Sequence, residues 1–328
     1  MGRDRFRDGL RPFNVLQDLG PVAELIGAAF GDKLDPGGRA ALAEMRRAAR
    51  WGAWLGWLAW SGGAGNGAMP GFVWVEEGRV VGNVSLRRAL GWGGYMLGNV
   101  AVHPDWQERG IAGRLLEAAL NEIERRSGRW VGLEVRAGNE VARQLYERRG
   151  FREVGRTAHY LRPGELGPVE PPEAIPELRR GRGGDHSGLV KLLRDVVPAV
   201  QRPLLELRQE DYHPGWERAL DHWLEGRRER WWVVEEAGEI VGAVRALRER
   251  KRRPDRIEVL VHPRHEGRLE GPLVRRGVAG LSGTRKVTEA LMPAPTEPMI
   301  RALEAAGFER LRGLVQMQLD LGYRIPLG

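Results

Sequence analysis

The segment Val102–Leu116, with the sequence VHPDWQERGIAGRLL, combines residue types and spacings that suit an anion. A run of apolar residues leads into a turn that contains Gly110, and a helical apolar pattern follows. Backbone N–H groups without partners, together with the helix dipole, favour negative charge at such a helix start, and Gly110 lets the backbone approach a ligand without an intervening Cβ. Small residues there suit close packing equally well. The pattern Q-x-x-G-x-A over 107–112 is neither a Walker loop nor a dinucleotide fingerprint.

The segment 133–151, LEVRAGNEVARQLYERRGF, adds side chains that could move protons. On a helix, Asn139, Ala142 and Tyr146 are three and four residues apart and share one stripe, which predicts a helix that lines a cleft. The neighbouring stripe, expected to face the core, holds Val141 and Leu145. Glu134 belongs to an otherwise apolar strand, where a carboxylate is paired, lies at a strand end or is functional. Taken singly, Tyr146 is also explained as a packing residue and Asn139 as a helix N-cap.

Together the two segments resemble the GCN5-related N-acetyltransferase (GNAT) family. The resemblance rests on Q-x-x-G-x-A after the strand VAVHP, followed in order by LEVR, N..A..LYE and GF, and it covers roughly 70–161. Within the family, the second segment is most similar to the branch that acetylates protein N-terminal amines, the ribosomal-protein alanine N-acetyltransferases. The resemblance implies acetyl transfer from acetyl-CoA to a primary amine, either a protein N-terminus or a small amine, by direct attack in a ternary complex. It implies no metal.

The resemblance also implies where acetyl-CoA binds. Its pyrophosphate would lie on the backbone N–H groups of 109–114, its pantetheine arm would pair with the strand 100–102 like an extra strand, and Asn139 would hydrogen-bond the arm. The donor-site residues expected on this basis are Val100, Ala101, Val102, Gln107, Glu108, Arg109, Gly110, Ile111, Ala112, Gly113, Arg114, Asn139 and Ala142.

In that branch, the positions that match Glu134 and Tyr146 act as base and acid. A protonated amine cannot attack a thioester, so it must first lose a proton, directly or through water. The unperturbed pKa of a Glu, about 4.3, is low for this task, so burial or a water relay must help Glu134. A phenol has a pKa of about 10 and is protonated at neutral pH, so Tyr146 can donate to the departing thiolate. A backbone N–H of 100–102 could polarise the thioester carbonyl.

These segments need elements that position them, and the hydrophobic periodicity predicts mixed strands and helices. Asp18 is predicted to cap a helix over 19–29. The other elements expected in the first half are a hairpin over 72–85, strands over 95–102 and 130–135, helices over 109–126 and 139–149, and a final strand over 152–161. We therefore expect an α/β (α+β) fold in which a mixed, mostly antiparallel sheet is flanked by helices.

The chain is predicted to contain this fold twice. Three pairs of residues in similar motifs recur in one order at a spacing of 157 to 160 residues: Gly82 and Gly242, Pro104 and Pro263, Gly150 and Gly307. We infer a duplication, with a catalytic GNAT domain over 1–162, a Pro-rich linker over 163–176 and a degenerate GNAT-like domain over 177–328.

The second half keeps the corner but loses its pattern. After Pro263 the sequence RHEGRLEGPLV has no Q-x-x-G-x-A, and Pro272 intrudes near the helix start. Counted back from the Gly-Phe pair, Leu303 stands where Tyr146 stands in the first half. We predict that the second domain neither binds CoA tightly nor catalyses, and that it completes the acceptor pocket or forms an interface.

Composition excludes several other classes. The 328 residues contain no cysteine, so a disulfide framework, thiolate catalysis and a cysteine metal site are excluded. The start MGRDRFRDGLRPF lacks the apolar core of a signal peptide, and the apolar run WGAWLGWLAW over 51–60 is shorter than the roughly 20 residues that span a bilayer. The sequence thus predicts a cytoplasmic protein without a membrane partner. The tryptophans of this run are expected to pack on the sheet or to line the acceptor pocket.

Two other functions stay open. A non-catalytic acyl-CoA-binding or interaction protein would keep the fold without turnover. The basic run 248–253 could bind nucleic acid or an acidic protein, but it lacks interleaved aromatic residues and is better explained as a solvated hairpin connection. The net charge of +8 favours anionic ligands without specifying one. The sequence does not identify the acceptor amine, and it leaves a homo-oligomer open.

Overall fold

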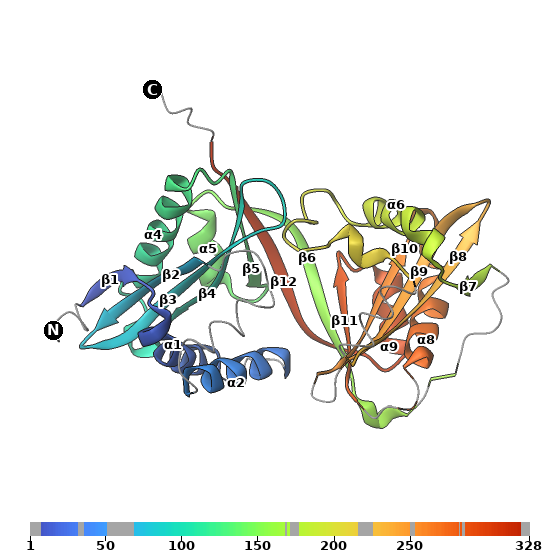
Figure 1. Cartoon of the computed structure of the whole chain (residues 1–328), viewed down its shortest axis with the longest axis horizontal. Coiled ribbons are helices and arrows are strands. Elements are labelled where there is room, and N and C mark those ends of the chain that lie inside the picture. The colour runs from blue at the N-terminus through green and yellow to red at the C-terminus, as the bar shows by residue number, and fades with distance from the viewer. Residues whose placement is uncertain are drawn as a thin grey trace. The chain divides into compact units, whose positions relative to one another are not determined.

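The computed structural model describes residues 8–31, 36–50, 69–167, 169–170, 177–215, 226–249, 253–281, 283 and 286–322 (Figure 1). The chain divides into two compact units. Unit 1 comprises residues 1–135, 139–153 and 317–328, and unit 2 comprises residues 136–138 and 154–316. The Trp-rich run 51–60 and residues 171–176 of the predicted linker lie outside the described residues.

Unit 1 is built on a sheet with both pairing directions. Its strands lie in the order β1 (Gly9–Pro12), β2 (Met69–Glu76), β3 (Arg79–Arg88), β4 (Gly94–Val102) and β5 (Trp130–Arg136). The pairs up to β4 are antiparallel, and β4 and β5 are parallel. The helices are α1 (Val15–Phe30), α2 (Pro36–Arg50), α4 (Ile111–Arg125) and α5 (Glu140–Glu147). Helix α4 is the crossover that a parallel pair of strands requires.

Helices α1 and α4 cover opposite faces of this sheet, because successive side chains of a strand alternate between faces. On one face Val73 and Val75 of β2 pack with the apolar side of α1, which contributes Val22, Ala23 and Ile26. On the other face Gly82 of β3 lets α4 approach closely. A Cβ at Gly82 would lie 2.9 Å from Ile111 Cγ2 and 2.9 Å from Leu115 Cδ1.

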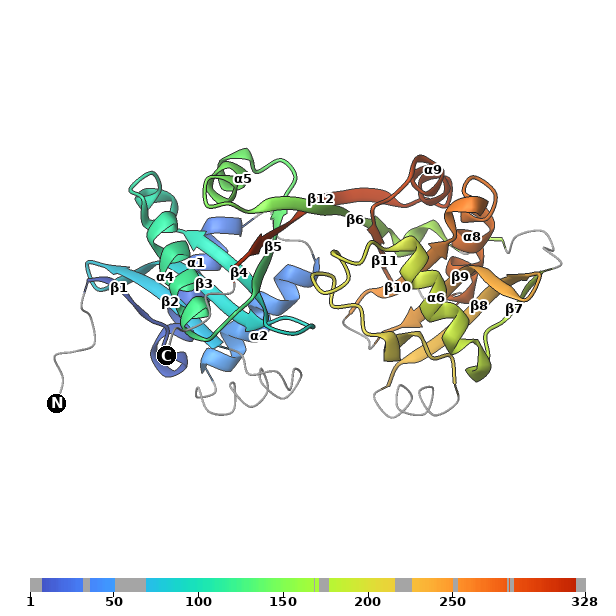
Figure 2. The ribbon, with the colours of Figure 1, turned by 90° about the horizontal axis from the view of Figure 1, so that it is seen from above.

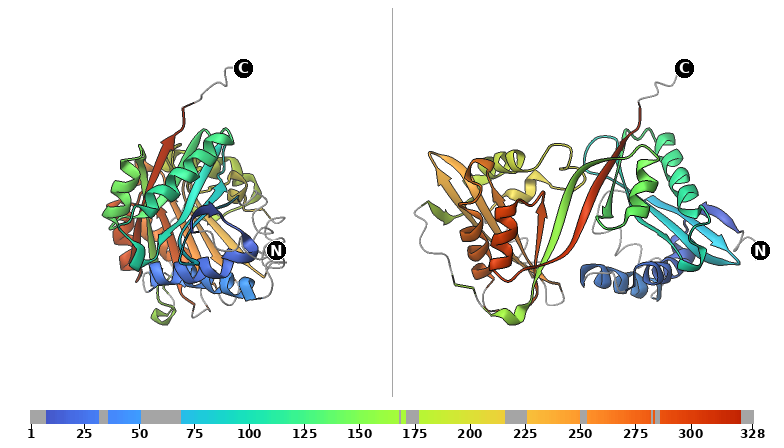
Figure 3. Two further views of the ribbon diagram at one scale, coloured as in Figure 1. Left: turned by 90° about the vertical axis from the view of Figure 1, so that its left-hand side faces the viewer. Right: turned by 180° about the vertical axis from the view of Figure 1, so that it is seen from behind.

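Unit 2 repeats this plan. Its strands lie in the order β12 (Glu309–Asp320), β6 (Arg152–Arg162), β11 (Thr288–Pro293), β10 (Asp255–Val261), β9 (Glu239–Arg248), β8 (Arg228–Glu236) and β7 (Leu178–Arg180), and β10 and β11 are parallel, as β4 and β5 are. Helix α6 (His186–Val196) packs with Trp231 and Val233. Helix α8 (Glu270–Gly280) packs with Trp232 and Val234 on the opposite face, together with α9 (Glu297–Ala305) (Figures 2 and 3).

The last strand of each sequence half does not stay with that half. Most of β6, from the first half, belongs to unit 2, where it pairs antiparallel with β11. The end of β12, from Met317 onward, belongs to unit 1. There Met317 is fully buried, and the Leu321 N–H donates to the Arg129 carbonyl oxygen at 2.8 Å. Unit 2 is therefore completed by most of β6 from the first half of the sequence, and unit 1 by the end of β12 from the second half.

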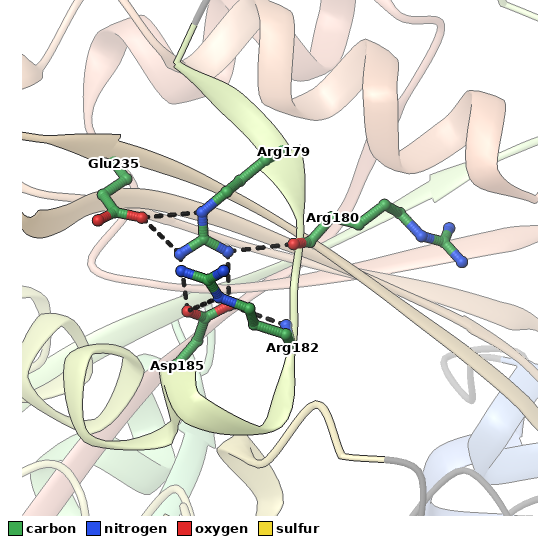
Figure 4. A network of polar contacts seen from close by, with 5 residues as sticks. All are labelled: Arg179, Arg180, Arg182, Asp185 and Glu235. Carbon is green, nitrogen blue, oxygen red and sulfur yellow. Dashed lines mark hydrogen bonds and ion pairs between the residues drawn. The ribbon is translucent and has the colours of Figure 1, made fainter.

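A repeated ion pair supports the duplication. In unit 1, Arg11 of β1 forms two hydrogen bonds, of 2.6 and 2.7 Å, to the buried carboxylate of Asp18 in α1. In unit 2, Arg179 of β7 forms two, of 2.8 and 2.7 Å, to the buried Asp185 just before α6, and it also binds Glu235 (Figure 4). Each arginine thus joins the edge strand of its unit, β1 or β7, to the start of the helix that follows this strand in the sequence.

The sheet-and-helix fold class expected from the sequence is confirmed, and the predicted strands and helices of the first half are present with ends shifted by a few residues. The predicted role of Asp18 as an N-cap was wrong. Asn14 caps α1 by accepting from the Leu16 N–H at 3.0 Å, while Asp18 lies one turn inside the helix and pairs with Arg11. The domain limits at 162 and 177 stay predictions.

Candidate active site

The predicted anion site is a tight turn between β4 and α4. Gln107 Nε2 donates to the Val102 carbonyl oxygen at 3.2 Å, which ties the turn to the end of the strand. Glu108 and Gly110 have left-handed backbone, with φ of 64° and 75°. Glycine adopts this conformation without strain, whereas it costs a glutamate about 1–2 kcal/mol. These two residues redirect the chain from the strand into the helix.

Helix α4 starts without a side-chain cap. Gly110 is its N-cap, and the Gly110 carbonyl oxygen accepts from the Arg114 N–H at 3.2 Å. Within the described part of the chain, the N–H groups of Ile111, Ala112 and Gly113 have no acceptor. A Cβ at Gly110 would meet no atom within 4 Å, so the space there is open. The buried side chain of Ile111 leaves only its backbone to a ligand. Parallel N–H donors beside open space suit an anion.

Three arginines add positive charge around this helix start. Arg109 and Arg114 are exposed, and the Arg114 guanidinium carbon lies 5.3 Å from the centroid of the Trp74 ring. Arg149 Nη2 donates to the Gly113 carbonyl oxygen at 3.4 Å. This contact brings the end of α5 beside the first turn of α4. Sequence reasoning missed Arg149, because nothing in its spacing relates it to the corner.

A bulge bends β4 just before the segment 100–102. Asn99 has a φ of 50°, and the register with β3 shifts between Asn83 and Ser85. Asn83 is fully buried, and its Nδ2 donates to the Asn99 carbonyl oxygen at 2.9 Å. Asn tolerates left-handed backbone better than most residues. The bulge was not predicted, and the recurring Gly-Asn pairs at 82–83 and 98–99 are the available signal.

Beyond the bulge, β4 separates from β5. Their parallel register ends at Leu97 opposite Leu133, and no later pair forms among the described residues. Ala101 and Val102 pair with β3 on their other side. The segment Val100–Val102 therefore keeps one edge of backbone groups available to an extended ligand, next to the helix start.

Glu134 is exposed on the sheet face away from α4. Gly82 faces α4, and Arg87 lies an odd number of residues later on the same strand, so Arg87 faces away from α4. The strand register places Arg87 opposite Met96 of β4, and Met96 opposite Gly132 of β5. Glu134, two residues further on, shares this face. Burial lowers the pKa of Arg87, and the Glu134 carboxylate opposes that shift. Sequence reasoning missed this cationic neighbour, which favours the ionised form of the carboxylate. Because Glu134 is exposed, burial does not help it act as a base. Of the two expected aids, the water relay is therefore the one that stays open.

Tyr146 is 6% exposed. Its ring is tilted against Phe151, with the ring centroids 5.8 Å apart. Burial raises the pKa of Tyr146 to about 12. Its hydroxyl makes no hydrogen bond within the described residues. The phenol thus keeps its proton across the neutral range and has no internal acceptor for it, which suits a proton donor.

Helix α5 packs with a different stripe from the one predicted. Val141, expected to face the core, is 83% exposed, so this prediction was wrong. Leu145 is half-buried, and Tyr146 is the buried residue of the helix. A helix of eight residues is oriented by its contacts at both ends rather than by its own periodicity. Asn139 is the N-cap and accepts from the Ala142 N–H at 3.2 Å.

A cavity of about 700 Å³ in unit 1 lies elsewhere, between α1 and the β2–β3 turn. Arg11, Asp18, Arg79 and His103 are among its lining residues, and none of the predicted site residues lines it. The predicted donor site is a helix start and a strand edge, so it is not part of this cavity.

No group of His, Asp and Glu in the described ranges could hold a metal ion. None of the helices that the structure describes is both long enough and apolar enough to cross a membrane.

Comparison with protein families places this site in a known class. Residues 70–153 match the family model of the acetyltransferase (GNAT) domain. The chain therefore contains a GNAT acetyltransferase domain, which spans β2 to the start of β6 and includes every predicted site residue. The resemblance stated from the sequence is confirmed for this segment, and a GNAT domain implies acetyl transfer.

The curated relatives are more specific but match a shorter segment. The chain is 46% identical over 56 residues to the [ribosomal protein bS18]-alanine N-acetyltransferase of Escherichia coli (strain K12), and 48% identical over 56 residues to that of Salmonella typhimurium. The match covers 17% of this chain and 38% of each relative, so it spans little more than a third of their length.

Solved structures match over nearly the whole chain. A GCN5-related N-acetyltransferase from Sphaerobacter thermophilus aligns over 98% of this chain and 97% of its own, with a TM-score of 0.64 and 18% identity. A tandem GNAT protein from the clavulanic acid biosynthesis pathway aligns over 95% and 98%, with a TM-score of 0.57 and 18% identity. Such likeness shows the fold, a mixed sheet flanked by helices, as the sequence predicted.

Proposed function

We propose that this chain moves the acetyl group of acetyl-CoA to a primary amine, by direct attack in a ternary complex at a site in unit 1. The uncapped start of α4 is the observation that carries the proposal. Its N–H donors are beside open space and arginines, and the available edge of β4 lies next to them. A ligand that joins a diphosphate to an extended amide-bearing arm matches both features.

The donor contacts follow from these positions. The diphosphate lies on the N–H groups of 109–113, and the side chains of Arg109 and Arg114 add charge-assisted contacts. Gln107 and Glu108 shape the turn, and the arm pairs with Val100–Val102. Asn139 uses its side-chain oxygen as the helix cap, so its amide N–H group is the part that reaches the arm. Ala142, small and half-buried, leaves room beside it.

The chemistry needs one base and one acid. Glu134, acting through water, takes the proton from the ammonium group of the acceptor. The neutral amine nitrogen attacks the thioester carbonyl carbon, a C–N bond forms and the C–S bond breaks. Tyr146 gives its proton to the departing thiolate, and a backbone N–H of 100–102 stabilises the oxyanion. The attacking nitrogen gives its second proton to the Tyr146 phenolate, and Glu134 releases its proton to water, so the products are the acetylated amine, the CoA thiol and one proton.

The acceptor class is proposed from the relatives. Their name specifies an alanine of ribosomal protein bS18, which favours a protein N-terminal amine over a small amine for this chain.

Replacing Tyr146 by Phe tests the acid. Because Phe keeps the packing against Phe151 but has no proton to give, we expect turnover to fall about 100-fold while the affinity for acetyl-CoA is unchanged. Thiol release from acetyl-CoA against a panel of peptides and small amines measures turnover. Tyr95→Phe is the matched control, since Tyr95 is also a buried tyrosine of unit 1 but lies near the far end of β4. Equal rates for wild type and Tyr146→Phe would exclude the acid role.

The rival function is acyl-CoA binding without turnover. Measurable CoA binding by calorimetry, together with no thiol release against any acceptor, would favour it. No CoA binding at all would reject both.

We also propose that unit 1 is the catalytic copy of a duplicated domain and that unit 2 does not catalyse. Leu303, at the position of Tyr146, is fully buried in the core of unit 2, where it can donate no proton. The stoichiometry of CoA binding by calorimetry tests this, because two CoA molecules bound per chain would contradict it.

A further inference from the structure

Unit 2 keeps the strand–turn–helix corner that unit 1 uses for an anion. The two corners pack in the same way. A Cβ at Gly242 would lie 3.0 Å from Leu269 Cδ1 and 3.0 Å from Leu273 Cδ1, just as one at Gly82 would meet Ile111 and Leu115. Leu269 therefore takes the place of Ile111. The next residue, Glu270, takes the place of Ala112, and Gly271 that of Gly113.

Glu270 puts a carboxylate where unit 1 has a methyl group. Its side chain is 2% exposed, and its two carboxylate oxygens accept from the Gly267 N–H at 3.0 and 2.9 Å. Gly267 is the left-handed residue of this turn, with a φ of 85°. The carboxylate thus reaches back from the first residue of α8 to a backbone donor of the turn, as the glutamate of a capping box does. Its charge also complements the positive end of the helix dipole.

Other changes in this corner agree. The turn is one residue shorter than in unit 1, and Arg268, rather than a left-handed glycine, precedes the residue that takes the place of Ile111. Pro272 stands where Arg114 stands, which removes both a backbone N–H and a cation. Pro272 lies near the helix start, as expected, in the first turn of α8, where a missing N–H costs nothing. Strand β10 also pairs with β9 without the register shift of β4.

We propose that Glu270 is an internal substitute for the phosphate of a ligand, and that it closes the corner of unit 2 to phosphorylated donors. A diphosphate placed there would meet a buried negative charge, and the Gly267 N–H would already be in use. The chain therefore binds one molecule of acyl-CoA, in unit 1. In unit 2 the carboxylate of Glu270 takes the place of the anion. This inference rests on the structure of unit 2, and only its control in unit 1 rests on the proposed function.

The experiment measures backbone hydrogen exchange of the full chain at residues 262–275, with and without inorganic pyrophosphate. In the wild type we expect pyrophosphate to change nothing there. In Glu270→Ala the freed donors should exchange about tenfold faster. In Glu270→Ala/Pro272→Ala, which also restores an N–H, pyrophosphate should return the exchange toward the wild-type rate. Glu270→Gln keeps the volume and an acceptor oxygen but not the charge, and should give an intermediate rate.

Three outcomes would overturn the proposal. Pyrophosphate that protects 262–275 in the wild type would show that the corner is open. Unchanged exchange in Glu270→Ala would show that the carboxylate holds nothing. If exchange in the double variant is faster and pyrophosphate does not reverse it, Glu270 is a helix cap and does not replace an anion.

Ala112→Glu is the matched control in unit 1. It introduces the same carboxylate at the equivalent position, so it should weaken pyrophosphate protection of 103–115 at least tenfold and leave 262–275 unchanged. If pyrophosphate does not protect 103–115 in the wild type, the proposed function of unit 1 fails, and the tests at 262–275 still decide the role of Glu270.

Discussion

At the residue scale, the two candidate proton carriers have opposite environments. Tyr146 is buried, and its pKa is raised to about 12, while Glu134 is exposed beside Arg87. The difference keeps the phenol protonated and the carboxylate ionised over the same range of pH, which is the arrangement that an acid and a base need. Their residue types were evident from the sequence. Their burial and the neighbour of Glu134 were not, since both depend on how strands and helices pack.

The raised pKa of Tyr146 predicts a loss of stability in alkali. The unfolded chain releases this proton near pH 10 and the folded chain only near pH 12, so between these values the unfolded state binds fewer protons and stability falls as pH rises. Between pH 10 and 12, the free energy of unfolding of the wild type should fall by about 2 kcal/mol more than that of Tyr146→Phe. Urea unfolding of both proteins at several pH values measures this. Parallel pH curves would contradict it.

Arg87 should set the acid limb of the pH–rate profile. Removing its charge makes the ionised form of Glu134 less favourable, so in Arg87→Gln the limb should move to higher pH, by about one unit, while Arg87→Lys should keep most of the wild-type position. The profile of kcat/KM against pH measures the shift. Arg88→Gln is the control, because the adjacent residue faces the other side of the sheet. A limb that does not move in Arg87→Gln would remove Glu134 or its neighbour from the mechanism.

At the element scale, β4 is the strand that makes a donor site available. A regular strand would pair with β5 along its whole length and leave no edge for a ligand. The bulge at Asn99, held by Asn83, ends that pairing, and the turn after β4 then presents the start of α4. The periodicity of 95–102 and 109–126 predicted both elements. It could not predict the bulge, because one extra residue in a strand changes its pairing without changing its composition.

Asn83 should therefore matter more for the donor than for the fold. Asn83→Asp keeps the shape but cannot donate to the Asn99 carbonyl oxygen, so we expect KM for acetyl-CoA to rise about tenfold and the free energy of unfolding to fall by about 1–3 kcal/mol. Steady-state kinetics and urea unfolding measure the two effects. Ser85→Ala is the milder control, because the Ser85 side chain lies beside the same bulge but makes no bond to the Asn99 carbonyl oxygen. An unchanged KM would mean that the bulge does not shape the donor site.

At the scale of the whole molecule, the two copies of the duplicated domain differ in two ways: they exchange strands, and their candidate sites have different residues. Unit 2 takes most of β6 from the first half of the sequence, and unit 1 takes the end of β12 from the second half. Unit 1 keeps an open helix start and a buried phenol, and unit 2 has a carboxylate and a leucine at the matching positions. The proposed single active site and the closed corner are consistent with a duplication in which only one copy had to keep the chemistry.

A chain that ends at residue 316 should lose stability in unit 1. It lacks the end of β12, including the buried Met317 and the Leu321 N–H that binds Arg129. We expect unit 1 to be destabilised by at least about 2 kcal/mol and unit 2 to be affected less. Hydrogen exchange of 94–135 compared with 228–261 measures this. A chain that ends at residue 322 is the control and should behave as the wild type. Equal exchange at 94–135 in both truncated chains would contradict the assignment of this strand to unit 1.

The sequence by itself predicted the family, the duplication and the location of the candidate anion-binding corner, because these predictions depend on residue types at short spacing and on repeats along the chain. Only the tertiary structure decided which neighbours these residues have. It placed Arg87 beside Glu134, Arg149 beside the start of α4 and a strand of each half in the other unit, because these contacts join segments far apart in sequence. It also showed that Glu270 points back into its own turn, since the direction of a side chain follows from packing and not from its place in a pattern.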